Sequence, residues 1–173
     1  AQDQWQGPIA RGEAVPALAL LERGQRYATT PVRTHAQAGH GGMTLSGSKH
    51  VVRAAAQAHV LLVSALYQGA PALFAVAAGA SGMRLGRYVL QDGSAAADVH
   101  FDATPATLVC ANATEALATA QDWGVALTCG RGVGAMDATL RITAEYLNTR
   151  KQFGVPIGQF QALRHRLADM KMA

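Results

Sequence analysis

The sequence has few of the features that mark several large classes of protein. Its 173 residues include only two cysteines, 6% aromatic residues and 15% charged residues. Cys110 and Cys129 show no spacing typical of a metal site or a disulfide framework, which suits a reducing cytoplasm. No apolar run approaches the roughly 20 residues that cross a bilayer. The polar segment 1–7 lacks the charged and apolar regions of a signal peptide. These absences predict a globular, cytoplasmic protein with no membrane span.

The sequence also has no dense cluster of positive charge. The net charge is +4, but the 15 lysines and arginines are spread along the chain. Their densest group comprises Arg150, Lys151, Arg164, Arg166 and Lys171. A nucleic-acid surface usually carries more basic residues with aromatic residues between them, so we expect no nucleic-acid partner. One or two of these side chains could still bind the phosphates of a nucleotide cofactor.

Metal-binding and phosphate-binding patterns are incomplete. Three of the six histidines, His35, His40 and His50, fall near one expected hairpin, but no acidic residue or cysteine completes a metal spacing. The run 130–134, Gly-x-Gly-x-Gly, lies within a helical pattern and follows no strand. We therefore predict no metal site, and close helix packing rather than dinucleotide binding for the glycines.

Two helices dominate the C-terminal third of the chain. Apolar residues recur every three to four positions from Val133 to Leu147, with Leu127 on the same stripe before them. This pattern predicts a long buried helix that starts near Asn112 or Thr114 and ends near Arg150. Gly154 and Pro156 then require a turn. The apolar stripe resumes in 160–170, so the second helix should pack antiparallel to the first. Without further helices, this stripe would form a large exposed apolar patch.

The first two thirds of the chain have the pattern of a sheet. Short apolar or alternating runs predict strands in 14–21, 32–36, 43–45, 49–52, 60–64, 73–76, 83–89 and 96–101. We expect turns at 39–42 and at Gly47-Ser48, and a loop over 102–112. Closely spaced short strands favour an antiparallel sheet curled into a small barrel or sandwich. The fold class is therefore α+β, a small β barrel followed by long antiparallel helices.

A family resemblance begins around the helix turn. It is carried by Glu145-Tyr146, Arg150-Lys151-Gln152-Phe153-Gly154, Pro156-Ile157, Phe160-Gln161 and Leu167-Ala168-Asp169-Met170. These segments resemble the signature that opens the C-terminal helical domain of the FAD-dependent acyl-CoA dehydrogenases. An ordinary helical hairpin would explain the stripe and the turn, but not the fixed order of these residues.

The resemblance extends over nearly the whole chain. Leu18 to Gly24 and Leu45-x-Gly47-x-Lys49 are similar to strands of the family's middle domain, and residues 8–13 to the end of its N-terminal helical domain. It implies three parts: 1–13 as the end of the N-terminal domain, 14–112 as the middle β domain, and 113–173 as the first helices of the C-terminal domain. The chain would then cover less than half of a usual member.

The family oxidises the bond between the alpha and beta carbons of an acyl-CoA thioester, with hydride passing to the flavin. The resemblance thus implies an oxidoreductase of fatty acid metabolism that takes acyl-CoA as substrate and FAD as cofactor. Electron-transfer flavoprotein is the expected electron acceptor of the intact enzyme. The intact protein would be a homo-oligomer or one subunit of a hetero-oligomer.

The resemblance also assigns cofactor-binding positions. Arg150 would reach the flavin diphosphate, Phe153 would pack on the cofactor, and Gln161 would contribute to the same pocket. On the sheet, Leu18, Leu20 and Leu21 would lie along the flavin from one strand, and Val51, Val52 and Arg53 from another. Two alternatives stay open: these leucines and valines could be sheet core, and Arg150 could complement the helix dipole.

Several positions depart from the family pattern. Leu21 replaces a threonine that usually bonds the flavin ring, and Val51 replaces an aromatic residue that commonly covers it. Arg26 and Tyr27 occupy the expected substrate-binding position, which indicates a carboxylated or bulky acyl chain, or else a surface turn. Lys49 has the pattern of a sheet-edge lysine.

No residue of the chain is a convincing catalytic base. The resemblance implies that the catalytic base is a glutamate, which most members carry downstream of the position of Ala173 and some carry on the long helix. The helix position falls at Gly124, and the neighbouring Glu115, Asp122 and Asp137 have the spacing of solvated helix faces. We expect the base to lie outside this chain, so that the chain alone is inactive. The competing hypothesis is a non-catalytic subunit or assembly module, which Leu21, Val51 and Gly124 favour. A basic binding protein on the same scaffold is disfavoured by the sparse charge.

Overall fold

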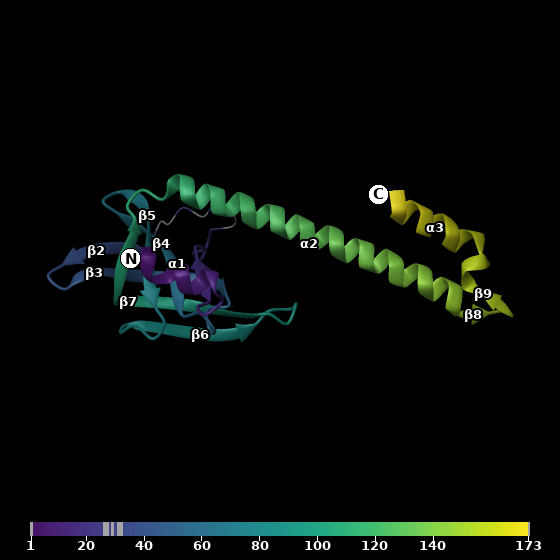
Figure 1. Cartoon of the computed structure of the whole chain (residues 1–173), viewed down its shortest axis with the longest axis horizontal. Coiled ribbons are helices and arrows are strands. Elements are labelled where there is room, and N and C mark those ends of the chain that lie inside the picture. Colours follow the sequence, from purple (N-terminus) through teal and green to yellow (C-terminus); the bar gives the residue numbers. More distant parts are fainter. Residues whose placement is uncertain (1, 26–27, 29, 31–32, 173) are drawn as a thin grey trace. The chain divides into compact units, whose positions relative to one another are not determined.

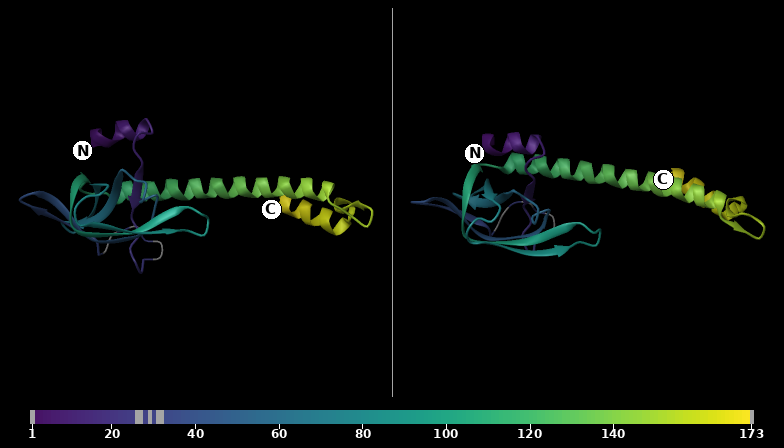
Figure 2. Two further views of the ribbon diagram at one scale, coloured as in Figure 1. Left: turned by 90° about the horizontal axis from the view of Figure 1, so that it is seen from below. Right: turned by 60° about the horizontal axis from the view of Figure 1, so that its bottom comes forward.

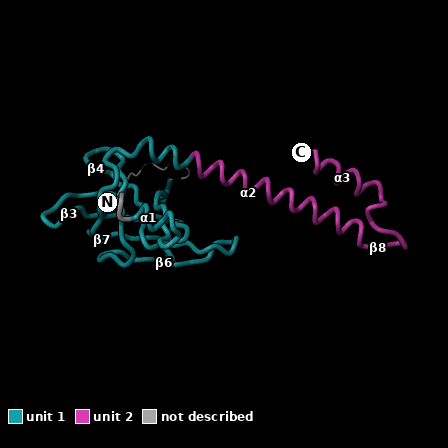
Figure 3. Tube along the Cα trace, in the orientation of Figure 1, with its two compact units in different colours: residues 1–121 teal, residues 122–173 magenta. Residues whose placement is uncertain are grey.

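The computed structural model describes residues 2–25, 28, 30 and 33–172 (Figure 1). It divides into two compact units, Ala1–Gln121 and Asp122–Ala173, drawn in different colours in Figure 3. Among the described residues, no helix is both long enough and apolar enough to cross a membrane.

The first unit contains a closed sheet. It begins with helix α1 (Gln2–Ala10), and its strands are β1 (Pro16–Ala19), β2 (His35–Gly39), β3 (Gly42–Arg53), β4 (Val60–Tyr67), β5 (Ala70–Ala77), β6 (Met83–Val89) and β7 (Ala95–Cys110). β4, β5, β7, β3 and β2 pair in that order, and β2 meets β4 again where His35 pairs with Leu66. The sheet thus closes into a small barrel, with β1 added beside β4 and β6 beside β7. The predicted order of a β barrel followed by helices is confirmed.

The barrel core is built from alternating strand residues. Ala17 and Ala19 of β1 are buried, while Leu18 between them is exposed, as the two-residue period of a strand requires. The largest fully buried apolar side chains include Leu45, Phe74 and Phe101. Many of the remaining core positions are alanines, so neighbouring strands can approach closely inside this small barrel.

Two expectations about the sheet are wrong in detail. β1 runs parallel to β4, with Pro16 opposite Val60, so the sheet is not wholly antiparallel. β3 continues through Gly47-Ser48, where we expected a turn. Gly47 has a φ of +137°, and a Cβ there would lie only 2.7 Å from the Thr34 Cα. Glycine is therefore needed for a bulge and a close backbone approach, not for a reversal of the chain.

The expected loop over 102–112 is also wrong in large part. β7 extends to Cys110, because its second half pairs on both sides: Thr104 opposes Leu45 of β3, and Leu108 opposes Phe74 of β5. Local propensity gave little indication of this extension, since partners more than thirty residues away supply the hydrogen bonds.

The second unit contains most of helix α2 (Thr114–Thr149), the short strands β8 (Lys151–Gln152) and β9 (Val155–Pro156), the 3-10 turn η1 (Ile157–Gln159) and helix α3 (Gln161–Met172). The predicted ends of the long helix at Thr114 and near Arg150 are confirmed. Phe153 and Gly154 both have positive φ, +52° and +83°, which closes the β8–β9 hairpin. α3 then turns back along the C-terminal part of α2, as the views in Figure 2 show.

Candidate cofactor site

The end of β1 and the middle of β3 lie side by side. The backbone N–H of His50 donates a hydrogen bond of 2.8 Å to the Leu21 carbonyl, and the Lys49 ammonium donates one of 3.1 Å to the Leu20 carbonyl. These bonds attach one proposed flavin-binding segment, residues 18–21, to Lys49 and His50, which directly precede the other proposed segment, residues 51–53.

Side chains in these two segments differ in exposure. Leu18 and Val51 are 43% and 44% exposed. Leu20 and Leu21 are half-buried, and Val52 is only 1% exposed. Val52 is therefore part of the sheet core, as the alternative interpretation of these residues expected. The side chains of Leu18 and Val51 are instead exposed on the outside of the barrel. Arg53 is paired with Asp92 at 2.9 Å and bonds the Ser94 hydroxyl at 3.1 Å.

A buried ion pair supports this junction. Lys49 and Glu22 lie 2.8 Å apart, with 0% and 2% of their side chains exposed. The Lys49 ammonium also donates to the Ser64 hydroxyl at 3.1 Å. Lys49 therefore lies inside the barrel, and the prediction of a sheet-edge lysine is wrong. Because all three of its ammonium protons have protein acceptors, burial is compensated by hydrogen bonds.

The Glu22 carboxylate has partners on both oxygens. Oε2 accepts the Arg33 amide at 2.8 Å, and Oε1 accepts the Thr34 amide at 3.1 Å. Burial by itself would raise the pKa of Glu22, but the hydrogen bonds from Lys49 and Thr34 and the charge of Lys49 outweigh it and lower the pKa to about 2. Burial lowers the pKa of Lys49, against the opposing effect of Glu22.

A second polar cluster surrounds Val51. The Asp98 carboxylate accepts the Val51 amide at 3.2 Å and the Tyr88 hydroxyl at 2.8 Å, and it lies 2.8 Å from His50 Nδ1. Burial tends to raise the pKa of Asp98, but the bonds from Tyr88, His50 and Val51 outweigh it, so the pKa is lowered. Burial and the bond to Asp98 raise the pKa of Tyr88.

Sequence reasoning missed both clusters. Glu22 lies in the segment 18–24 that resembles the family, and Lys49 lies in the matching segment 45–49. The sequence could therefore have suggested that Glu22 pairs with Lys49. Asp98 gave no such signal, because it alternates with Ala97 and Val99 as an outward polar residue of an ordinary strand. Arg26 and Tyr27, the predicted substrate-binding residues, lie outside the described residues.

The helix-turn residues form their own small structure in the second unit. Arg150 follows the last residue of α2, and its carbonyl accepts the Ile157 amide at 2.8 Å. The Arg150 side chain is exposed and has no hydrogen-bond or ion-pair partner within the described part of the chain. Phe153 is 91% exposed and meets Phe160 edge to face at 6.0 Å. Gln161, also exposed, opens α3.

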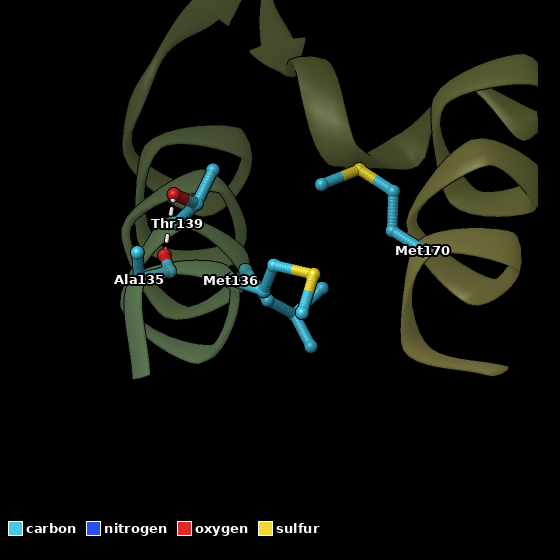
Figure 4. A pocket seen from close by; sticks show the side chains of 5 residues that line it. Ala135, Met136, Thr139 and Met170 are labelled. Carbon is cyan, nitrogen blue, oxygen red and sulfur yellow. Dashed lines mark hydrogen bonds between the residues drawn. The ribbon is translucent and has the colours of Figure 1, made fainter. Parts of the chain in front are cut away.

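An open apolar groove of about 410 Å³ lies between α2 and α3 (Figure 4). Met136 and Met170 face each other across it, and Ala135, Thr139 and Leu140 complete the lining. The Thr139 hydroxyl is already bonded to the Ala135 carbonyl at 2.8 Å. Met136 and Met170 are 65% and 48% exposed, and Leu127 and Val133 are also exposed. The apolar stripe predicted from the sequence is therefore largely uncovered in this structure.

The described residues contain no group of three or more histidine, cysteine or acidic side chains that could hold a metal ion. Gly124 lies on an exposed part of α2, and a Cβ added there would meet no described atom within 4 Å beyond its own stretch of helix. Glu115, Asp122 and Asp137 are exposed as well. None of these acidic residues is held in a desolvated setting that would favour a general base.

Comparison with known proteins gives a consistent result. Residues 97–173 match the family model described as "Acyl-CoA dehydrogenase, C-terminal domain". The chain is 32% identical to acyl-CoA dehydrogenase FadE27 of Mycobacterium tuberculosis, over 97% of this chain and 44% of that protein. It is 28% identical to the mitochondrial short-chain specific acyl-CoA dehydrogenase of Sus scrofa, over 99% of this chain and 45% of that protein.

A solved structure agrees in fold. Butyryl-CoA dehydrogenase from Megasphaera elsdenii superposes with a TM-score of 0.88 at 24% identity, over 99% of this chain and 48% of that one. The chain thus spans less than half the length of each of these relatives.

Proposed function

Because this chain belongs to the acyl-CoA dehydrogenase family, we propose that the intact protein is an FAD-dependent enzyme that oxidises the alpha-beta bond of an acyl-CoA thioester. Within this proposal, residues 1–13 are the end of an N-terminal helical domain, 14–112 the middle β domain and 113–173 the first part of a C-terminal helical domain. The observation that supports the proposal is the pair of hydrogen bonds that joins Leu20-Leu21 to Lys49-His50, beside the segments that the family resemblance assigns to the flavin.

The residues of this junction fit a flat aromatic ring. Leu18 and Val51 offer exposed apolar surface, and backbone groups near Leu21 and Arg53 can serve where the family's threonine hydroxyl is missing. When bound, FAD supplies the hydride acceptor of the reaction. The role of this chain is to hold and orient the ring and to keep water from one of its faces.

Arg150, Phe153 and Gln161 are the proposed contacts with the rest of the cofactor. Arg150 is exposed and uncommitted within the described residues, so its planar guanidinium can pair with a diphosphate. Phe153 presents nearly its whole ring. Its positive φ and its contact with Phe160 fix the direction of that ring. Complementing the helix dipole remains the competing role for Arg150.

The catalytic base of the proposed enzyme lies outside this chain. A general base in this reaction must be a desolvated carboxylate at the alpha carbon, and the exposed Glu115, Asp122 and Asp137 do not meet that requirement. Arg26 and Tyr27 are proposed to contact the acyl chain. Electron-transfer flavoprotein as acceptor, assembly as a homo- or hetero-oligomer, and a cytoplasmic location complete the proposal.

The second candidate is a non-catalytic or assembly subunit of an acyl-CoA dehydrogenase-like complex. It is favoured by Leu21, Val51 and Gly124. The resemblance implies that a threonine usually stands at the first position, an aromatic residue commonly at the second and, in some members only, the catalytic glutamate at the third. A titration is the first test: the intact protein, freed of bound cofactor, is mixed with FAD, and the flavin absorption bands are followed. Saturable binding with a shifted and structured spectrum supports a flavoprotein, and bleaching of the bound flavin by acyl-CoA then distinguishes the enzyme from a flavin-binding assembly subunit. Unchanged spectra of free FAD refute the enzyme and support the assembly subunit.

A further inference from the structure

Val51 has a backbone conformation that its side chain disfavours. Its φ is +51°, in the left-handed region, which is a true outlier for a β-branched residue. Such conformations persist only where the surroundings hold them, and they gather at functional sites. The question is therefore what holds Val51, and what its conformation achieves.

The strain belongs to a bulge in β3. Lys49 pairs with Val99 of β7 and Val52 pairs with Ala97, so two residues of β3, His50 and Val51, oppose the single residue Asp98. A bulge of this kind leaves one residue outside the hydrogen-bond ladder. The Asp98 carboxylate replaces the missing ladder partner by accepting the Val51 amide at 3.2 Å.

Asp98 is in turn held from two neighbouring strands. Tyr88 of β6 donates its hydroxyl at 2.8 Å, and His50 of β3 contacts the other carboxylate oxygen at 2.8 Å through Nδ1. The carboxylate thus has little freedom to rotate away from Val51. Three strands contribute to one anchoring cluster, which we call the Asp98 cluster: His50, Tyr88 and Asp98.

The bulge decides which side chain faces outward. In an unbroken strand Lys49 and Val51 would point to the same side, because side chains alternate. Here Lys49 and Val52 are both buried and Val51 is 44% exposed. Without the bulge, either the Lys49–Glu22 pair would be lost or Val51 would turn into the core.

We propose that Asp98 is a positioning residue for the cofactor: through the Asp98 cluster it holds the Val51 bulge and so sets the backbone and apolar face that meet the flavin ring. This inference rests on the proposed function, since it assumes that the flavin lies at this junction. Asp98 itself does not need to touch the cofactor.

The test compares three variants of the intact protein. Asp98→Ala removes the acceptor of the Val51 amide, and Asp98→Asn keeps one oxygen for it. Asp102→Ala is the matched control, because Asp102 is an exposed aspartate of the same strand whose carboxylate has no bond within the described residues.

Two readouts are needed. Amide hydrogen exchange at Val51 reports on the bulge whether or not flavin binds. The dissociation constant for FAD, together with the visible spectrum, reports on the cofactor. For Asp98→Ala we expect exchange at Val51 to be faster, and FAD binding to be weaker, by about tenfold each. Asp98→Asn should recover much of the FAD affinity, and Asp102→Ala should match the wild type.

Three results would overturn the inference. Unchanged exchange at Val51 in Asp98→Ala would show that the carboxylate does not hold the bulge. Faster exchange with unchanged FAD affinity would show that the bulge does not position the cofactor, while the proposed function would stand. Equal loss of affinity in Asp98→Ala and Asp102→Ala would indicate general destabilisation. If the wild-type protein binds no FAD, the proposed function fails first and the cofactor role fails with it.

Discussion

The Lys49 ammonium lies 2.8 Å from the Glu22 carboxylate in the barrel interior, where both side chains are almost completely buried. The pair spans 27 residues of sequence and ties β3 to the segment that follows β1. The same two segments carry the proposed flavin residues. The ion pair therefore links the interior of the barrel to the shape of the proposed site.

Replacing Lys49 alone should destabilise the folded protein strongly. In Lys49→Met the Glu22 charge stays buried without its cation, and we expect the free energy of unfolding to fall by about 3–5 kcal/mol. Lys151→Met, at an exposed lysine, is the control and should change little. The double variant Glu22→Gln with Lys49→Met should recover part of the loss, because no uncompensated charge remains. Denaturant unfolding of the three variants checks this, and equal stability of the two single variants would contradict it.

Stability should also fall in acid. The pKa of Glu22 is lowered in the folded state to about 2 from an ordinary value of 4.5. The stabilisation from this group is therefore fully present above pH 4.5 and is lost as the pH falls from there toward 2. It amounts to the order of 3 kcal/mol. Glu22→Gln should show a flatter dependence over this window in thermal or denaturant unfolding. A variant curve parallel to that of the wild type would exclude this contribution of Glu22.

Gly47 tests the close approach between β3 and the start of β2. A Cβ at this position would lie 2.7 Å from the Thr34 Cα, so Gly47→Ala must displace backbone. Gly79→Ala is the matched control, since Gly79 also has a positive φ, of +74°, but faces open space. We expect Gly47→Ala to be the less stable variant by about 1–3 kcal/mol. Equal unfolding free energies of the two variants would mean that positive φ alone accounts for the cost.

Arg150 tests the diphosphate contact. Arg150→Ala should weaken FAD binding by about ten- to a hundredfold, the range of a charge-assisted hydrogen bond. Arg150→Lys should recover only part of this, because lysine lacks the planar fork. Arg166→Ala removes another exposed arginine of the second unit and should leave the FAD dissociation constant unchanged. If Arg150→Ala and Arg166→Ala bind FAD equally well, Arg150 does not contact the diphosphate and only complements the helix dipole.

The helical part of the fold could be predicted closely, because its determinants are local. The apolar repeat from Val133 to Leu147 defines one helix, and Gly154 and Pro156 define the turn. Both signals act over a few residues. The match of Arg150 to Gln161 with a family signature rests on the same short stretch.

The sheet was predicted in its strands and in the hairpin that pairs 43–45 with the preceding strand, but not in its long-range pairing. Three features of the sheet depend on strands that are far away in the sequence: the length of β7, the bulge at Gly47 and the bulge at Val51. The residues around a bulge do not by themselves reveal the one-residue shift of register that it introduces. The burial of Lys49 follows from those bulges, so its role could not be read from an alternating pattern. The Asp98 cluster joins three strands and is visible only once they are paired. The flavin-binding and substrate-binding roles stay predictions.

The most direct test is anaerobic addition of acyl-CoA thioesters to the intact, FAD-loaded protein, with the visible spectrum recorded throughout. An acyl-CoA dehydrogenase should lose its oxidised flavin absorption as the substrate is dehydrogenated, and electron-transfer flavoprotein should restore it. If the flavin binds but its absorption stays unchanged with short, long, branched and ring-bearing acyl-CoA substrates, the dehydrogenase proposal is contradicted and a non-catalytic subunit becomes the better description.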